Sequence, residues 1–304
     1  MMSEIVKSDI FPVACPVCGS KKQKILYEDS LGDDLPPFDY AFSPEHMRTY
    51  RIARCESCSH AFCILPRENI WKNYQSVVDS EYLNRGEAHI LTAKKVIAVM
   101  KKYIAKGKLL DVGCATGDFL TAAQDYYSVE GLELSKWSSE IAQKRGFNVH
   151  TCTISELPQY ERYDVITLWG VIEHFESPAQ EIEKISRIIK PGGYIFLWTG
   201  DIDSWLARLL GKHWWYIQGQ HIQFFSKKSL NRLFLNYGFK PVNIEKYPFT
   251  TDLNTFSKSF FRYRTLRSLA KLVLANRFVR NKVITLRLPG EMLAVYRKED
   301  STSS

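Results

Sequence analysis

A glycine-rich turn followed by an acidic residue is the first feature of this sequence that could do chemistry. The run Leu109–Gly117, LLDVGCATG, places glycines at positions 113 and 117. Such a turn lets the backbone approach a ligand closely, and the helix expected after it offers unpaired N–H groups. A glycine turn also serves tight packing, but Glu133 follows 20 residues after Gly113, where a carboxylate can accept both hydroxyls of a ribose. Together the two features predict a nucleoside cofactor.

Two Cys-x-x-Cys pairs form the second chemical feature. Cys15 and Cys18 make one pair and Cys55 and Cys58 the other, with 36 residues between the pairs. Four thiolates suit a closed tetrahedral zinc site, which does no chemistry of its own. His60 is a lesser alternative for one of the four ligands. We therefore expect a structural zinc ion here rather than a set of disulfides.

The elements that must position these residues begin at Lys108, where strand-like and helix-like segments start to alternate. This order predicts an α/β fold with a Rossmann-like, doubly wound sheet of seven strands and helices on both of its faces. The expected strands are 108–113, 128–134, 147–153, 163–170, 194–200, 240–249 and 291–298. The expected helices among them are 118–126, 136–146, 178–193 and 226–239, the third ending at its Pro-Gly-Gly.

The composition divides the chain into parts. Residues 1–68 hold both cysteine pairs and are expected to form a zinc-binding module, 69–106 a helical linker or lid, and 107–304 the main domain with insertions at 201–225 and 252–289. The N-terminus does not resemble a signal peptide, and no apolar run reaches the roughly 20 residues that cross a bilayer. We therefore expect a cytoplasmic protein.

The motifs of the main domain resemble, in their order, those of class I S-adenosylmethionine (SAM)-dependent methyltransferases. The run 111–117 is similar to the D-x-G-x-G-x-G motif of that family, with Ala115 at the middle glycine, which fits if its φ is negative. The G-x-G-x-x-G fingerprint of NAD enzymes is not matched. The resemblance implies SAM as cofactor, bound by Asp111, Gly113, Ala115, Gly117, Glu133, Leu134, Ile154 and Trp169. The last three could equally be core residues.

The N-terminal region carries a second resemblance. Its cysteine pairs are similar to the zinc-binding region of sugar C-methyltransferases and related enzymes of polysaccharide biosynthesis. That resemblance implies that residues 201–225 face the acceptor, and that His221 is the substrate-site histidine. The family carries Glu-His where this chain has Gln220 and His221, so the paired acid and base is in doubt. The expected acceptor is a sugar, a nucleotide sugar or a lipid-linked glycan.

Methyl transfer to a hydroxyl or a carbon acid also needs a base, and histidine titrates near neutral pH. His221 is the first candidate and His174 the second, although each could instead hold a loop in place. Glu173 and His174 also resemble part of the metal-binding run of ubiquinone-pathway O-methyltransferases. Gly170 stands where that run has another glutamate, so we do not expect a catalytic metal.

The formal charge of +8 comes from one segment, because nine basic residues and no acid lie between Leu253 and Gly290. Residues 263–280 read as a basic amphipathic helix, which could contact an anionic membrane or pack on its own domain. Nucleic acid is not the expected partner, since the fourth strand ends in WGVIEHF rather than the Asn-Pro-Pro type of run used in base methylation. An RNA methyltransferase is the first alternative function, and a catalytically inactive SAM-fold binding protein the second.

Overall fold

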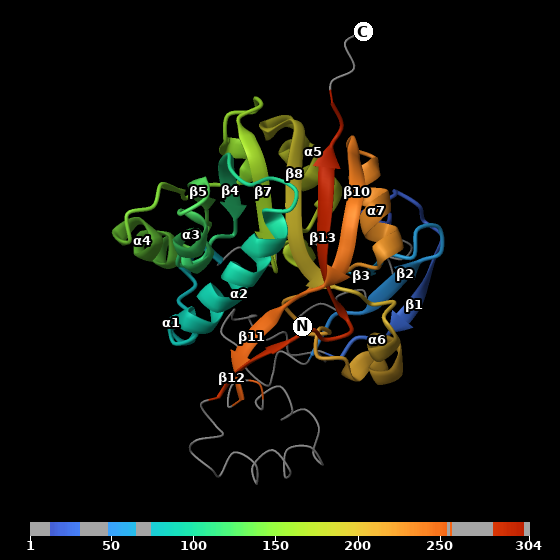
Figure 1. Ribbon diagram of the computed structural model, residues 1–304. Coiled ribbons are helices and arrows are strands. Elements are labelled where there is room, and N and C mark those ends of the chain that lie inside the picture. Colours follow the sequence, from blue (N-terminus) through green and yellow to red (C-terminus); the bar gives the residue numbers. More distant parts are fainter. Residues whose placement is uncertain (1–12, 31–47, 65–73, 254–255, 257–281, 301–304) are drawn as a thin grey trace, which may run out of the picture.

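The computed structural model describes residues 13–30, 48–64, 74–253, 256 and 282–300. Its largest sheet is built from β4 (Lys108–Val112), β5 (Ser128–Leu132), β6 (Val149–His150), β7 (Tyr163–Trp169), β8 (Ile189–Gly200), β10 (Phe239–Lys246) and β13 (Glu291–Lys298). The strands lie in the order β10-β13-β8-β7-β4-β5-β6. Strands β4 to β8 pair with one another in parallel, whereas β13 runs antiparallel to both β8 and β10, as its arrow in Figure 1 shows.

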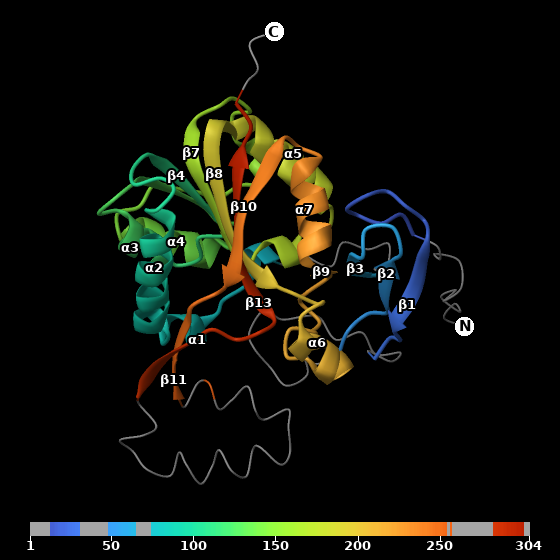
Figure 2. The same ribbon diagram turned by 45° about the vertical axis from the view of Figure 1, so that its right-hand side comes forward.

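Helices cover both faces of this sheet, as its edge-on view in Figure 2 shows. Helices α2 (Gly86–Met100) and α3 (Asp118–Ala123) pack on one face, and α5 (Pro178–Ile188) and α7 (Lys227–Leu235) pack on the other. Helix α4 (Lys136–Lys144) lies beside β6. The predicted seven-stranded, Rossmann-like sheet is therefore confirmed.

Helix α2 lies within the segment expected to form a linker or lid. Its Ala93, Val96, Ile97 and Met100 recur at helical spacing and are all at most 5% exposed. They pack against α3 and the sheet, which accounts for the helical pattern of the sequence. Lys94 and the lysine after it remain exposed on the outer side.

A second sheet has four strands in the order β1-β2-β3-β9. Strands β1 (Gln23–Tyr27), β2 (Ile52–Cys55) and β3 (Ala61–Cys63) come from the cysteine-rich region, whereas β9 (Gln223–Phe224) comes from the far end of the 201–225 insertion. We call residues 13–30 and 48–64 the cysteine module. Its apolar side chains join the same core cluster as those of α5 and α7.

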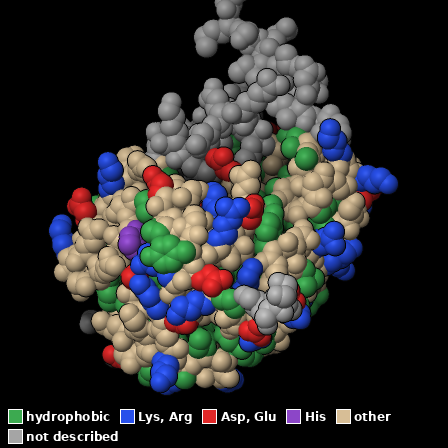
Figure 3. Space-filling model, turned by 90° about the horizontal axis from the view of Figure 1, so that it is seen from above, with side chains coloured by type: hydrophobic (Ala, Val, Ile, Leu, Met, Phe, Trp, Pro, Cys, Tyr) green, Lys and Arg blue, Asp and Glu red, His purple; other side chains and the backbone are tan. Residues whose placement is uncertain are grey.

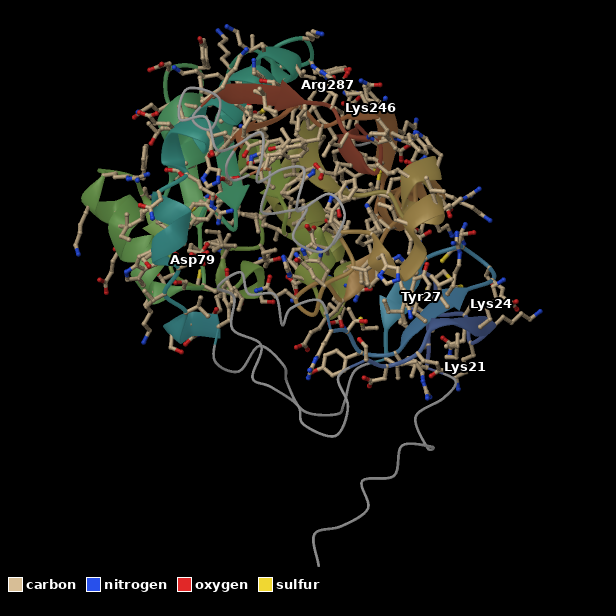
Figure 4. All side chains as sticks on the ribbon, turned by 90° about the horizontal axis from the view of Figure 1, so that it is seen from below. Lys21, Lys24, Tyr27, Asp79, Lys246 and Arg287 are labelled. Carbon is tan, nitrogen blue, oxygen red and sulfur yellow. The ribbon has the colours of Figure 1, made fainter. Side chains whose placement is uncertain are left out.

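Short elements surround the edge of the large sheet at which its parallel strands end. They are η2 (Tyr74–Ser76), α1 (Ser80–Leu83), η3 (Ile154–Glu156), η4 (Ile172–His174), α6 (Trp205–Leu210), η5 (Gly211–His213), β11 (Phe249–Asp252) and β12 (Val283–Leu286). Figure 4 views this edge from below, with Tyr27 of the cysteine module on one side, Asp79 before α1 on another, and Lys246 and Arg287 on a third. Among the described residues, no helix is long and apolar enough to span a bilayer.

Several of the predicted boundaries are wrong. The helix expected over 226–239 ends at Leu235, because Phe239 already begins β10. The helix expected over 178–193 ends at Ile188, because the chain from Ile189 onward pairs with β7 and carries Pro191 and the glycines after it into β8. The strand expected over 147–153 is only two residues long, at the edge of the sheet. The helix expected over 263–280 lies outside the described residues.

Candidate functional site

The glycine-rich turn connects β4 to α3 and lies against the end of β5. The N–H of Gly113 donates to the carbonyl of Leu132 at 2.7 Å, and the φ of Gly113 is +70°. A Cβ at this position would lie 2.6 Å from a methyl group of Val171. Both the conformation and the close approach therefore require glycine.

The expectation of a negative φ at Ala115 is wrong. Its φ is +47°, in the left-handed region, which costs an L-residue about 1–2 kcal/mol. The reason lies in its N–H, which donates to Oε2 of Glu133 at 3.0 Å. The turn thus holds Ala115 in the conformation that a glycine at this position would adopt without strain.

Glu133 lies directly after β5 and faces the turn. Its Oε2 accepts from Ala115, its Oε1 accepts the N–H of Ser135 at 2.7 Å, and the hydroxyl of Tyr74 also hydrogen-bonds to it. The residue is 3% exposed, and burial raises the pKa of the carboxyl while these hydrogen bonds oppose the rise. The carboxylate is therefore fixed beside the turn, as the predicted ribose contact requires.

Asp111, also expected at the cofactor, lies beneath the turn. It is 2% exposed, and its Oδ1 accepts from the hydroxyl of Thr167 at 2.6 Å. Burial raises the pKa of this carboxyl to about 8. These contacts give Asp111 a supporting role below the turn, and its direct contact with a cofactor stays a prediction.

The three remaining predicted cofactor residues differ in their surroundings. Leu134 is half-buried next to Glu133. Ile154 is 3% exposed and belongs to the core cluster, which favours the packing role for its side chain. Trp169 ends β7 with its ring centroid 5.1 Å from that of Phe119, and its indole N–H has no partner among the described residues. The contacts of Leu134 and Trp169 with a cofactor stay predictions.

Residues 74–90 lie over the turn. The hydroxyl of Ser135 donates to the carbonyl of Val77 at 2.9 Å, and His89 bonds the carboxylate of Asp118 at 2.9 Å. Arg145 reaches the other oxygen of Asp118 at 2.7 Å. These bonds connect the lid segment to the first residue of α3 and to the loop after β5.

Arg85, within this lid segment, was not singled out from the sequence. Its Nε is buried and has no hydrogen-bond partner among the described residues. The guanidinium lies close enough to Tyr82 to lower the pKa of that hydroxyl, which burial and the nearby Asp118 raise. A buried guanidinium nitrogen without a partner suits a carboxylate ligand. The sequence signal that could have identified Arg85 is its position directly before a helix that must cover a nucleoside site.

The two candidate bases, His174 and His221, lie next to each other with ring centroids 4.9 Å apart. Nδ1 of His174 is 2.7 Å from the carbonyl of Gln220, and Nδ1 of His221 is 2.8 Å from that of Tyr216. Because a carbonyl can only accept, each ring carries its proton on Nδ1 and keeps Nε2 as an acceptor. The side-chain amide of Gln218 lies 3.0 Å from Nε2 of His221.

Burial makes both imidazoles weak bases in this structure. It lowers the pKa of His174 to about 4 and that of His221 well below the ordinary value. Such a group takes up a proton readily only where a negative charge stabilises the imidazolium. The nearest carboxylate is that of Glu173, and one ligand atom from each of these three residues lies within 4.8 Å of the others.

Glu173 was expected only as a neighbour of His174, and its contacts are more specific. It is 1% exposed, its Oε1 accepts from the hydroxyl of Tyr216 at 2.5 Å, and its Oε2 accepts from that of Thr199 at 3.2 Å. Burial raises the pKa of Glu173 to about 7. The carboxyl of Glu173 and the hydroxyls of Tyr216 and Thr199 thus form one hydrogen-bonded group with the two imidazoles beside it, and we call these five side chains the acid–base cluster.

Aromatic rings and a second buried carboxyl line the same edge of the sheet. Trp198 stacks on Tyr247 with ring centroids 4.9 Å apart, and the Trp169 ring lies 6.3 Å from that of Tyr247. Oε1 of Glu291 accepts from the indole of Trp215 at 3.2 Å, and the indole of Trp198 lies close enough to lower the pKa of this carboxyl as Trp215 does. Burial raises the pKa of Glu291 to about 7. This group could not be recognised from the sequence, because β8, β10 and β13 meet only in the folded sheet.

The four predicted zinc ligands lie together in the cysteine module. The Sγ atoms of Cys15 and Cys58 are 3.6 Å apart, as are those of Cys18 and Cys55. Ligands about 2.3 Å from a tetrahedral zinc lie about 3.8 Å from each other, so the cluster has the size that zinc requires. Gly19, with a φ of +71°, makes the tight turn after the first pair. The chemistry and geometry of these four thiols therefore fit zinc.

The glycine-rich turn, the carboxylate at the end of the next strand and the sheet that carries them define a SAM-dependent methyltransferase. The methyltransferase-domain family matches residues 87–244, just over half of the chain, and the chain belongs to this family. Solved structures agree with this fold. A SAM-dependent methyltransferase from Archaeoglobus fulgidus superposes with a TM-score of 0.50 at 15% identity, over 72% of this chain and 100% of that one. The methyltransferase solved with the activator Trm112 from Haloferax volcanii gives 0.52 at 17% identity, over 73% and 95%.

Two kinds of relative are similar in sequence. The uncharacterized protein MJ1123 of Methanocaldococcus jannaschii is 28% identical over 57% of this chain and 82% of its own length. The ubiquinone biosynthesis O-methyltransferases of Leptothrix cholodnii and Saccharophagus degradans are 33% and 36% identical over 30% and 32% of this chain. The matches span only 43% and 44% of those two enzymes, so they concern part of the methyltransferase domain.

Proposed function

We propose that this methyltransferase transfers the methyl group of SAM to a small polyhydroxylated acceptor: a sugar, a nucleotide sugar or a lipid-linked glycan. The observation that carries the proposal is the stacked pair of Trp198 and Tyr247 beside the buried carboxyl of Glu291. Aromatic faces cover the apolar faces of a small ligand, and a few placed polar groups orient it. The carboxyl of Glu291 keeps lone pairs beyond its contacts with two indoles, and in the proposal a hydroxyl of the acceptor donates to one of them.

The cofactor half of the reaction follows from the turn and its neighbours. SAM supplies an electrophilic methyl group when it is bound. Glu133 would accept the ribose hydroxyls, the backbone of Gly113–Gly117 would approach the methionine part, and Arg85 would pair with its carboxylate. Methyl transfer is an in-line displacement, so holding the two reactants in line can supply about 7–11 kcal/mol of the barrier reduction.

The attacking group of the acceptor must lose one proton, and a base on the acceptor side must take it up. In the proposal, the acceptor displaces the amide of Gln218 from Nε2 of His221, and Nε2 then takes the proton of the attacking group. Ionised Glu173 stabilises the imidazolium through its position in the same cluster. The hydroxyl of Tyr216, bonded to Glu173, keeps that carboxylate in place. His174 lines the other side of His221 and is the second candidate for the proton.

The test is the release of S-adenosylhomocysteine by the purified protein with a panel of nucleotide sugars, glycolipids and small phenols, and with transfer and ribosomal RNA. We expect turnover with a member of the sugar-bearing classes. His221→Ala is expected to lower that turnover by about 10²- to 10⁴-fold with SAM affinity unchanged. His213→Ala is the matched control, because His213 is an exposed histidine of the same insertion. Turnover on RNA alone contradicts the proposed acceptor class, and full activity of His221→Ala removes that residue from the mechanism.

The relatives bear on which class of acceptor is methylated. Those named as ubiquinone biosynthesis O-methyltransferases favour a hydroxyl on a small molecule as the accepting group. RNA methylation would favour a surface of concentrated positive charge. On the face of the described residues shown in Figure 3, Lys and Arg side chains are interspersed with Asp and Glu. A catalytically inactive binding protein is the remaining alternative, and it would bind SAM without turnover on any class of acceptor.

Two further parts of the proposal concern zinc and membranes. The cysteine cluster would hold one structural zinc ion. Peripheral contact with the inner face of a membrane would involve the 252–289 segment, of whose described part Lys282 and Arg287 are exposed and basic. Such charges suit anionic lipid headgroups. Failure of the protein to pellet with vesicles of phosphatidylglycerol at low salt would contradict the membrane contact.

A further inference from the structure

The backbone immediately after His221 is a strand of the cysteine module's sheet. In the pairing of β9 with β3, Gln223 lies opposite Phe62. Beside this pair, the N–H of Cys63 donates to the carbonyl of Ile222 at 2.8 Å. The end of the acceptor-side insertion is thus held by main-chain bonds to a module more than 150 residues earlier in the sequence.

Gln223 adds a side-chain connection among three segments. Its Oε1 lies 2.8 Å from Nε2 of His60, and its amide nitrogen donates to the carbonyl of Phe175 at 2.9 Å. Because that amide group is oriented by Phe175, His60 must be the donor to Oε1. His60 and Gln223 are 0% and 3% exposed. His60 therefore does not belong to the cysteine cluster, as one alternative from the sequence would have it, but connects the module to β9 and to the residue after His174.

His221 itself is held between the module and the acid–base cluster. Its carbonyl accepts from the thiol of Cys63 at 3.7 Å. The N–H of the next residue, Ile222, donates to the carbonyl of Glu173 at 3.0 Å. At the start of the insertion, Arg54 of β2 forms a salt bridge with Asp203. The module therefore contacts the 201–225 insertion at both of its ends.

We propose that the cysteine module is the positioning element of the acceptor side, and that Gln223 and His60 are positioning residues that set the place and tautomer of His221. The inference rests on the proposed function in one respect, namely the role of His221 in proton transfer. It has a specific consequence. A disturbance of the module should change the hydrogen exchange of residues 216–226 and not that of the cofactor turn, which is bonded to the end of β5 and to Glu133 after it.

The experiment is hydrogen exchange of the full-length protein, followed by mass spectrometry, for Gln223→Leu and a matched control. Gln143→Leu is the control, because the Gln143 amide also donates to a carbonyl, that of Val149, at 3.0 Å on the opposite edge of the large sheet. We expect Gln223→Leu to speed exchange in peptides covering 60–64 and 216–226 by roughly 10- to 100-fold, as loss of two buried hydrogen bonds would. Exchange of peptides covering 108–135 and the affinity for SAM should stay unchanged.

A second readout separates positioning from general loss of stability. In nitrogen-15 NMR spectra of the histidine rings, His221 of the wild type should show the tautomer with its proton on Nδ1. Gln223→Leu should give a mixture of tautomers and move the pKa of His221 upward toward its ordinary value, whereas Gln143→Leu should change neither. Arg54→Met provides a milder second variant if Gln223→Leu does not fold, and it should speed exchange at 201–210.

Unchanged exchange at 216–226 and an unchanged His221 signal in Gln223→Leu would overturn the inference, as would equal changes at 108–135. Neither readout needs an acceptor. If sugar-bearing compounds are not methylated but the exchange result holds, the acceptor class is wrong and the positioning role stands. If they are methylated and exchange is unaffected, the proposed function stands and the positioning role fails.

Discussion

Replacing Glu133 by glutamine tests the cofactor site most directly. The carboxylate accepts backbone N–H groups with both of its oxygens, so an amide at this position would turn its own NH₂ group toward one of those donors. The two ribose hydroxyls would then meet a neutral group that can accept at only one atom. A hydrogen bond to a charged group contributes about 1.5–3 kcal/mol. Loss of one such bond, with a misplaced donor, should cost about 2–3 kcal/mol, which weakens SAM binding about 30- to 150-fold.

Glu130 supplies a matched control on the same strand. Its carboxylate accepts from the hydroxyl of Tyr163 and from Lys108, each at 2.7 Å, away from the turn. Glu130→Gln keeps an acceptor but loses the charge, which should lower the free energy of unfolding by about 1–2 kcal/mol. SAM affinity should stay within a factor of about two, because no bond of Glu130 reaches the turn.

The assay is isothermal titration of SAM into each variant, together with thermal unfolding to show that each is folded. We expect Glu133→Gln to lower the affinity for SAM and Glu130→Gln to lower the free energy of unfolding. If Glu133→Gln binds SAM as tightly as the wild type, the carboxylate does not hold the ribose, and the assignment of the cofactor site to this turn is wrong. Equal loss of affinity in both variants would mean that general destabilisation explains the effect.

Three further predictions concern strain, pH and metal. Ala115→Gly should raise the free energy of unfolding by about 0.5–1 kcal/mol in urea denaturation, because the relief of a positive φ exceeds the added backbone entropy of the unfolded chain; Ala122→Gly, inside α3, should lower it by about 1 kcal/mol. Although burial raises the pKa of Glu130, hydrogen bonds from Lys108 and others lower it to about 2. Its contribution to stability is therefore complete above about pH 4.5 and is lost as the pH falls toward 2. In Glu130→Gln, the free energy of unfolding should depend less on pH between these two values. Purified protein should contain one zinc ion per chain by elemental analysis, and Cys58→Ser should abolish it; a metal-free, fully folded wild type would contradict the zinc site.

The turn and the carboxylate of the predicted cofactor site could be placed from the sequence, because each directly follows one of two consecutive strands. Gly113 follows β4 and Glu133 follows β5, and the positive φ of Gly113 belongs to the turn itself. The contact with Val171, which also excludes a Cβ at Gly113, comes from a segment 58 residues away. The large sheet was predictable for the same reason, since each strand and helix has its own pattern of buried residues. The conformation of Ala115 was not, because it depends on a hydrogen bond to a carboxylate 18 residues away.

The acceptor side could be predicted only in part. His174 and His221 were chosen from separate motifs, and their contact at 4.9 Å depends on how the insertion folds back onto the turn after β7. The depressed pKa of each ring depends on burial, which no local pattern encodes. Glu291 begins an antiparallel strand near the chain's end and reads as an ordinary charged residue until β13 is placed beside β8.

These differences follow from how the two halves of the site are supported. The cofactor turn rests on β4 and β5, whose parallel pairing and buried glycines leave little room for variation. The acceptor side rests on an insertion held by the cysteine module, by β13 and by side-chain contacts such as those of Gln223 and Arg54. Changes in that insertion can therefore alter the acceptor without disturbing SAM. By the same reasoning, loss of the metal expected in the cysteine cluster should disable methyl transfer while the protein still binds its cofactor.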